Sequence, residues 1–182
     1  MELTDLKRET QYFDNILPNE EEVFFKIKME TIWDESMISR KTKSYGDPYN
    51  YSNIHYSTIP FPSDIEKIAN YINIYLGFMP NNCLINYYYN EFSKMGFHSD
   101  QIDILEDNTG VAIISLGNKR TMRFKNKLNP AITFDVLLYP NSLFYMTQKV
   151  QELWLHAILS EVGNDSFERI SITFRKLRKQ IF

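Results

Sequence analysis

Two histidines and one aspartate carry the clearest chemical signal in this sequence of 182 residues. His98 and Asp100 are separated by one residue, so on an extended strand both side chains point to the same side. His156 is the only ionisable residue in the apolar run 153–159, which predicts a buried histidine that needs a polar partner. Two imidazoles and one carboxylate form the set that binds Fe(II) on one face and leaves positions open for a cosubstrate and oxygen.

Each part also has a simpler interpretation when it is taken alone. His98 and Asp100 could form a surface pair, and His156 could be a core histidine bonded to a backbone carbonyl. The interpretation as a metal site depends on all three residues being brought together by the fold.

Two arginines share one side of a strand predicted at 169–175. Ile170, Ile172 and Phe174 alternate with polar residues, which places Arg169 and Arg175 on the same face with about 20 Å between their Cα atoms. Guanidinium groups bind carboxylates in a bidentate manner, so the pair suits the two ends of a short dicarboxylate such as 2-oxoglutarate. In isolation, the same pattern is typical of a strand with a polar face toward solvent.

Asn86 and Tyr88 also alternate on one predicted strand. Their amide and phenol groups could donate hydrogen bonds to the same acid. By itself this is an ordinary tyrosine-rich strand.

The elements that position these residues are mainly strands. Alternating and β-branched runs predict strands at 83–89, 110–116, 120–125, 132–139, 143–147, 153–159 and 169–175. Helices are expected after Asn19, with three glutamates in the first turn, and from Ser63 to a stop at Gly77. Seven or eight strands without intervening helices predict an antiparallel sandwich or jelly roll, mainly β (α+β), with the N-terminal helices packed outside.

Length and composition favour one folded domain over 1–182. The chain is 43% hydrophobic and 24% charged, and its only cysteine, Cys83, excludes an internal disulfide. We expect a soluble, intracellular protein of the cytoplasm or nucleus, since no segment is typical of a signal peptide or membrane span. The net charge of −3 divides into −6 for residues 1–37, with ten acidic and four basic residues, and +3 for the remainder. The total therefore does not exclude a polyanionic partner.

The order of these motifs resembles the AlkB-like iron(II)/2-oxoglutarate dioxygenases, from about Ser39 to Lys176. The matching residues are Asn86 and Tyr88, His98 and Asp100, Ser115-Leu116-Gly117 with Arg120, Ser142-Leu143, Met146, Trp154, His156, and Arg169 with Thr173-Phe174-Arg175. The resemblance implies a double-stranded β-helix at 82–176, an N-terminal helical extension at 1–38 and a substrate lid at 39–62.

The same resemblance implies a role for each matching residue. His98, Asp100 and His156 would bind Fe(II), and Arg169 with Asn86 and Tyr88 would hold the distal carboxylate of 2-oxoglutarate. Arg175 would reach the carboxylate next to the keto group, and Ser171 stands where the family often has Asn. The implied reaction consumes O2, converts 2-oxoglutarate to succinate and CO2, and hydroxylates a C–H bond. A hydroxylated N-alkyl group then collapses and releases an aldehyde.

The implied substrate is an N-alkylated base of DNA or RNA. Tyr45, Tyr49 and Tyr51 of the expected lid could stack on an extruded base, and Arg120 with nearby lysines could hold phosphates. Nucleobase-repairing members usually carry an acid two residues after the metal-binding Asp, where this chain has Ile102; Asp103, one residue further on, is the substitute. A hydroxylase of a protein or small molecule, and a non-catalytic nucleic-acid-binding jelly roll, stay open as alternatives. The chain is expected to be a monomer without membrane contact.

Overall fold

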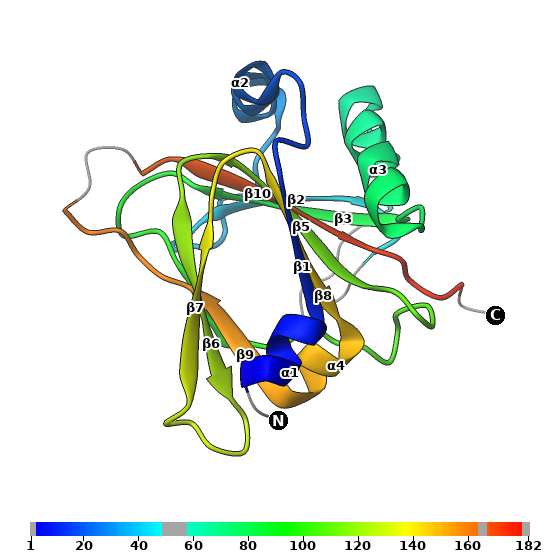
Figure 1. The fold of residues 1–182 in the computed structure, drawn as a ribbon. Coiled ribbons are helices and arrows are strands. Elements are labelled where there is room, and N and C mark those ends of the chain that lie inside the picture. Colours follow the sequence, from blue (N-terminus) through cyan, green and yellow to red (C-terminus); the bar gives the residue numbers. More distant parts are fainter. Residues whose placement is uncertain (1–2, 49–57, 164–166, 180–182) are drawn as a thin grey trace.

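The computed structural model describes residues 3–48, 58–163 and 167–179 and contains two antiparallel β-sheets packed face to face (Figure 1). The strands of the larger sheet are β1 (Thr10–Asp14), β2 (Lys41–Gly46), β3 (Asn82–Tyr88), β5 (Gly110–Gly117), β8 (Ser142–Thr147) and β10 (Arg169–Arg175). Those of the smaller sheet are β4 (Met95–His98), β6 (Arg120–Asn126), β7 (Thr133–Leu138) and β9 (Trp154–Ile158). The strand orders are β1-β8-β5-β10-β3-β2 and β4-β9-β6-β7, so neighbours in space are mostly distant in sequence. This is the predicted jelly roll.

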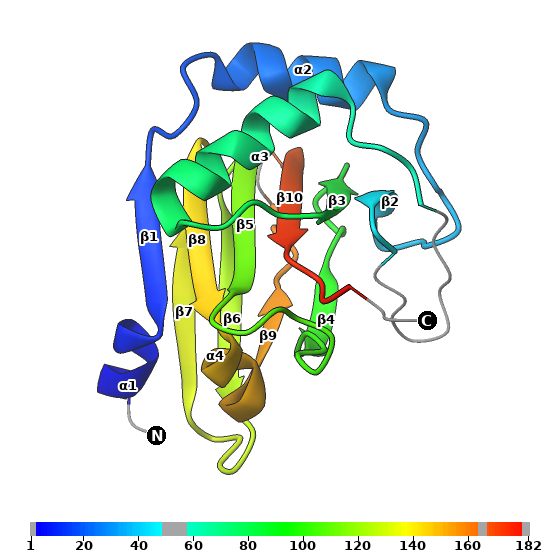
Figure 2. The ribbon, with the colours of Figure 1, turned by 90° about the vertical axis from the view of Figure 1, so that its right-hand side faces the viewer.

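In the described part of the chain, four helices accompany the sheets. Their bounds are α1 (Leu3–Arg8), α2 (Glu20–Glu30), α3 (Ser63–Leu76) and α4 (Gln148–Leu153). Helices α2 and α3 lie together on the outer side of the larger sheet, and α4 lies between β8 and β9 (Figure 2). None of the helices within the described residues is long and apolar enough to cross a bilayer.

The helix ends match the sequence in part. Gly77 has a left-handed backbone with φ of 76° and ends α3, as expected. Ser63, where the helix was expected to start, is its first residue, and Pro62 precedes it without a capping side-chain bond. The helix therefore begins directly after Pro62, whose backbone is still extended.

The apolar residues form two cores, one on each face of the larger sheet. The outer core joins α2 and α3 to that sheet through residues such as Phe24, Ile68 and Ile172. The inner core lies between the two sheets and contains Phe124 and Trp154. The larger sheet is thus covered on both faces, and polar side chains on its inner face are shielded from bulk water.

Strand β10 shows the consequence for the site. It lies between β5 and β3, and all seven of its residues are buried. Ile170, Ile172 and Phe174 point into the outer core, as the alternation predicts. Arg169 and Arg175 are on the opposite side, which faces the smaller sheet and not solvent. The polar face of this strand is therefore an interior wall.

Two segments outside the expected core at 82–176 contain strands of the larger sheet. The segment 1–38 is not only helical, because β1 pairs with β8 along its whole length, from Thr10 opposite Met146 to Asp14 opposite Ser142. The segment 39–62 is not only a lid, because β2 is paired with β3 and forms one side of the larger sheet. Both segments contribute strands whose backbone hydrogen bonds complete the sheet.

A turn before β8 fixes the N-terminal segment. Asn141 has φ of 57°, a left-handed conformation that asparagine tolerates better than other non-glycine residues. Its side chain accepts a hydrogen bond from Leu17 N (2.8 Å) and donates one to Leu17 O (2.9 Å). Asn141 therefore both forms the turn and anchors the chain that leads from β1 to α2.

A candidate metal centre and cosubstrate pocket

A pocket lies between the two sheets and is lined by residues from both. The larger sheet contributes the polar wall, with Asn86 and Tyr88 from β3 and the two arginines from β10. The smaller sheet contributes His98 from β4 and His156 from β9. The full lining is Leu84, Asn86, Tyr88, Met95, His98, Asp100, Ile113, Met122, His156, Ile158, Arg169, Ser171, Thr173 and Arg175.

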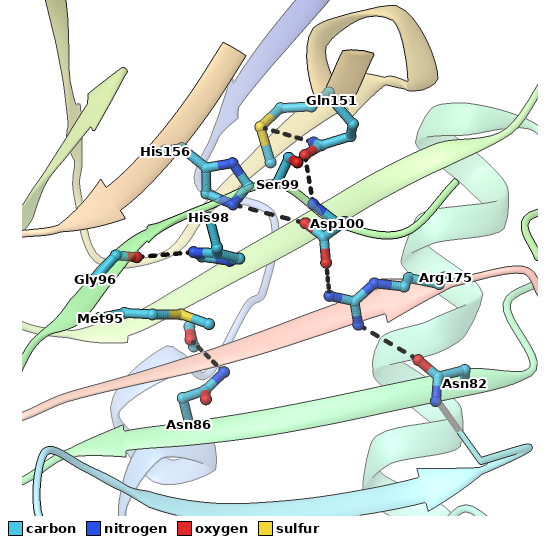
Figure 3. Close-up of polar contacts among 12 residues, drawn as sticks. Asn82, Asn86, Met95, Gly96, His98, Ser99, Asp100, Gln151, His156 and Arg175 are labelled. Atoms are coloured by element: carbon cyan, nitrogen blue, oxygen red, sulfur yellow. Dashed lines mark hydrogen bonds and ion pairs between the residues drawn. The ribbon is translucent and has the colours of Figure 1, made fainter. Parts of the chain in front are cut away.

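The three predicted metal ligands meet in this pocket. One ligand atom each from His98, Asp100 and His156 lies within 4.8 Å of the others (Figure 3). His98 and His156 are opposite each other in the β4–β9 register, and their ring centroids are 4.3 Å apart. The Nε2 atom of His156 is 3.6 Å from Oδ2 of Asp100. Strand pairing therefore brings together His98 and His156, which are 58 positions apart in the sequence.

The tautomer of His98 follows from a local contact. Its Nδ1 atom is 2.9 Å from the carbonyl oxygen of Gly96, two residues earlier (Figure 3). A carbonyl only accepts hydrogen bonds, so Nδ1 carries the proton and Nε2 keeps its lone pair. A hydrogen bond of this kind on the outer nitrogen is what orients metal-ligating histidines.

The two buried ligands, Asp100 and His156, are in the protonation states that a metal requires. Burial by itself would raise the pKa of Asp100, but the positive charge of Arg175 and the neighbouring histidines lower this pKa to about 2. Burial, together with nearby His98, lowers the pKa of His156 to about 3. At neutral pH the site therefore offers an ionised carboxylate and a neutral imidazole, the forms that bind a cation.

Arg169 is a buried cation with hydrogen-bonding capacity to spare. Its side chain is fully buried, and its Nη2 atom donates to Ser115 Oγ at 2.9 Å. Among the residues that the structure describes, Nε and Nη1 have no hydrogen-bond acceptor. Burial lowers its pKa to about 10, which leaves it charged at neutral pH. A buried guanidinium with two donor nitrogens unused within the described residues calls for an anion.

The other predicted cosubstrate residues line the same wall. Asn86 lies between two partners: its Oδ1 accepts from Arg40 Nε at 2.8 Å, and its Nδ2 is 3.5 Å from Ser171 Oγ. The ring of Tyr88 packs against the guanidinium of Arg169, 5.3 Å from ring centroid to Cζ. The fold thus brings together all five residues predicted to bind the acid, Asn86, Tyr88, Arg169, Ser171 and Arg175.

Arg120 is not available to hold phosphate, contrary to the prediction from its sequence neighbourhood. It is fully buried, and its guanidinium donates to four backbone carbonyls, those of Asn90, Ser93, Leu159 and Phe167, at 2.9–3.2 Å. It joins the β3–β4 connection, which contains Asn90 and Ser93, to the β9–β10 connection, which contains Leu159 and Phe167. The reason is its position in β6, on the same face as Met122 and Phe124.

Tyr45 is not a base-stacking residue either. It lies in β2 with 9% exposure, and its ring belongs to the outer core, on the side of the larger sheet away from the pocket. Asp103 is exposed in a turn and is absent from the pocket lining. Tyr49 and Tyr51 lie outside the described residues, so the prediction for them stays open.

Sequence reasoning missed several residues of the pocket environment. Thr173 lines the pocket between the two arginines; it is one of the matching residues named above, but no role in the pocket was predicted for it. Arg40 bonds to Asn86, although its sequence position indicated only a lid. Gln151 bonds to the backbone of a metal ligand, and no local pattern marks it.

The donor set and the wall around it fit one class of protein. A family model described as the 2OG-Fe(II) oxygenase superfamily matches residues 8–175, and the chain belongs to this superfamily. It is an AlkB-like dioxygenase, whose cofactors are Fe(II), 2-oxoglutarate and O2. The two nitrogens and one carboxylate of the site are the ligands that non-haem Fe(II) oxygenases use.

Several proteins are similar to this chain along most of its length. An uncharacterized protein of Acanthamoeba polyphaga mimivirus is 28% identical over 152 residues, which cover 82% of this chain and 73% of that protein. The human DNA oxidative demethylase ALKBH2 is 27% identical over 183 residues, which cover 95% of this chain and 66% of that protein. Human alpha-ketoglutarate-dependent dioxygenase alkB homolog 3 is 29% identical over 146 residues, 75% of this chain and 51% of that protein.

The chain is also similar in fold to a solved structure. The structure of OsALKBH1 superposes with a TM-score of 0.67, covering 92% of this chain and 96% of that chain at 15% identity. The fold is thus the AlkB-like double-stranded β-helix.

Proposed function

We propose that the enzyme removes N-alkyl groups from bases of DNA or RNA by oxidative dealkylation. Two observations together carry this proposal. The pocket contains a complete set of metal-binding and acid-binding residues, and 95% of this chain aligns, at 27% identity, with a protein named as a DNA oxidative demethylase. When bound, the Fe(II) centre supplies the oxygen activation that couples decarboxylation of 2-oxoglutarate to hydroxylation of the substrate. The residues described above bind and orient the two partners of that reaction.

The charges of the pocket support binding of a dicarboxylate. Arg169 and Arg175 line it, and Asp100 is the only carboxylate among the described lining residues. In this proposal Arg169, with Asn86, Tyr88 and Ser171, holds the distal carboxylate, because its Nε and Nη1 lack acceptors among the described residues. Arg175 holds the carboxylate next to the keto group, because it already contacts Asp100 and therefore lies beside the metal.

The smaller sheet supplies an apolar side to the pocket. Met95, Met122 and Ile158 line it opposite the arginine wall, and Met122 and Ile158 are buried. A lining of this kind excludes water from the site. The exclusion of water limits unproductive oxidation when the substrate carbon is absent or misplaced.

The outer face of the smaller sheet offers contacts for a nucleic acid. Phe97 directly precedes the ligand His98, is 38% exposed, and has the Lys125 ammonium 3.9 Å from its ring centroid. A base can stack on an exposed ring, and an ammonium next to it can neutralise a phosphate. Phe97 and Lys125 therefore replace Tyr45 and Arg120 as the proposed substrate contacts among the described residues.

The test is a succinate-release assay with Fe(II), ascorbate and 2-oxoglutarate against methylated DNA and RNA oligonucleotides, single- and double-stranded. Succinate and formaldehyde should form together with at least one oligonucleotide and be absent in His98→Ala and Asp100→Ala. Lys125→Ala should weaken oligonucleotide binding and reduce its salt dependence by about one charge. An unmethylated oligonucleotide is the matched control. If no oligonucleotide is bound and none is demethylated, the proposal of a base substrate is wrong.

A second candidate is a hydroxylase of a protein or small molecule. It is favoured by the position of Asp103, which is exposed and outside the pocket lining, while Ile102 packs against the inner core. No second carboxylate lines the described pocket to contact an alkylated base. The same assay separates the two, because 2-oxoglutarate consumption without oligonucleotide demethylation would favour this candidate.

We also propose that the enzyme works as a monomer built on one domain. All metal ligands and both arginines come from a single chain. A sedimentation mass close to the 21.7 kDa of one chain would agree with this, and a dimer mass would contradict it. Location in the cytoplasm or nucleus stays a prediction from the sequence.

A further inference from the structure

Strand pairing positions two of the three metal ligands but not the third. The β4–β9 ladder ends with His98 opposite His156, and β4 itself ends at His98. Asp100 is two residues beyond that end and is 7% exposed as a whole residue, and the hydrogen bond of its backbone N–H is buried. A buried backbone N–H beyond the last ladder rung needs another acceptor.

Gln151 of α4 supplies that acceptor. Its Oε1 accepts a hydrogen bond from the backbone N–H of Asp100 at 2.9 Å (Figure 3). The Gln151 side chain is 2% exposed, and its Nε2 is held 3.6 Å from Met146 Sδ. A buried glutamine amide of this kind has a single orientation, since its oxygen must face the donor.

Lys127 provides a second connection between α4 and the ligand segment. Its ammonium donates to the backbone oxygen of Gln151 at 2.7 Å and to Ser99 Oγ at 2.9 Å. Ser99 stands between the two ligands His98 and Asp100. Two independent contacts therefore join α4 to the three-residue segment that carries two of the ligands.

Helix α4 is also continuous with the strand of the third ligand. Gln151 lies five residues before His156, and β9 follows α4 without a break. A displacement of α4 would therefore move His156 and Asp100 together. We propose that Gln151 is a positioning residue that, assisted by Lys127, sets the distance of Asp100 from the two histidines and thereby the affinity for the metal.

The test measures Mn(II) binding to the apo protein, so its result does not depend on the substrate. Gln151→Met keeps the size of the side chain but lacks the acceptor, and Mn(II) affinity should fall roughly 10- to 100-fold, as for other residues behind metal ligands. The Asp100 amide, followed by NMR hydrogen exchange, should lose protection in the same variant. Lys127→Met should reduce Mn(II) affinity less, because the amide contact remains.

Val150→Ala is the matched control. Val150 is a fully buried neighbour in α4 that packs in the inner core, so its truncation destabilises the same helix without touching the contact to Asp100. It should bind Mn(II) as the wild type does. Wild-type Mn(II) affinity in Gln151→Met would overturn the proposal, as would an equal loss in Val150→Ala. If Gln151→Met does not fold, Lys127→Met decides: reduced affinity supports the role, and unchanged affinity overturns it.

Discussion

Arg175 donates a hydrogen bond from Nη2 to Oδ1 of Asp100, so β10, the strand of the arginine pair, is connected directly to a metal ligand. Both side chains are about 95% buried, and Arg175 Nη1 is also 3.5 Å from Asn82 Oδ1. The ion pair leaves Oδ2 of Asp100 on the side of His156, where a metal would bind. The cosubstrate wall and the metal centre therefore share one charged contact.

Replacing only one partner of the pair between Arg175 and Asp100 should lower the free energy of unfolding strongly. Arg175→Met removes the countercharge of a buried carboxylate, and the free energy of unfolding of the apo protein should fall by about 3–5 kcal/mol. Adding Asp100→Asn should restore much of the loss, which urea denaturation of the double-mutant cycle would measure. Arg178→Met, which breaks the exposed pair with Asp107, is the control and should change stability by less than about 0.5 kcal/mol. Additive losses in the cycle would contradict the coupling.

Replacing Arg169 should separate cosubstrate binding from metal binding. Hydrogen bonds to charged groups contribute about 1.5–3 kcal/mol, so Arg169→Ala should raise the KM for 2-oxoglutarate roughly 10- to 100-fold. Arg169→Lys keeps the charge but not the planar fork, and an intermediate KM is expected. Mn(II) titration should give wild-type affinity in both variants. An unchanged KM for 2-oxoglutarate would refute the assigned role.

Arg120 should behave as a structural residue. Arg120→Met leaves four backbone carbonyls without their donor, and the free energy of unfolding should drop by at least about 3 kcal/mol, measured by thermal or urea denaturation. Lys119→Met, at the exposed position next to it, should be nearly neutral. A stable Arg120→Met protein with weakened oligonucleotide binding would instead restore the phosphate-binding role.

Glu168 makes stability depend on pH. Burial acts to raise its pKa, but hydrogen bonds from Lys28 (2.8 Å) and Tyr87 outweigh burial and lower the pKa below its ordinary value. The contribution of ionised Glu168 to the free energy of unfolding is therefore complete above the ordinary glutamate pKa of about 4.3. It is lost as the pH falls through the lowered pKa of the folded protein. Glu168→Gln should flatten that part of a stability-against-pH curve.

The exposed residue Glu152 provides the control for this titration. Glu152→Gln should leave the shape of the curve unchanged. Parallel curves for wild type and Glu168→Gln between about pH 2 and pH 5 would show that Glu168 does not titrate differently in the folded protein.

Alternation in the sequence predicted the parts of the fold where one face is apolar. Strand β10 was predictable because Ile170, Ile172 and Phe174 mark its core side. Strand β2 was not, since its buried residues include the polar Thr42 and Ser44. Its place in the larger sheet depends on pairing with β3, whose partner residues are 46 positions away at one end (Lys41 and Tyr87) and 36 at the other (Gly46 and Asn82). Local patterns do not report such distant pairing.

The same limit explains the site. The metal ligands were predictable because His-x-Asp and a histidine in an apolar run are visible in sequence. The burial of Arg120 could have been predicted from its alternation with Met122 and Phe124, which outweighs the usual preference of arginine for the surface. Gln151 could not, because its partner is a backbone N–H of a distant segment and carries no residue type.

The pairing of β1 with β8 makes the N-terminal residues part of the catalytic fold. A shortened chain that began at α2 would lose β1 and the contact between Leu17 and Asn141, and it would expose the backbone of β8 along the edge of the larger sheet. An open edge of this kind pairs with other molecules, so such a fragment would aggregate or exchange strands before any loss of metal ligands was noticed.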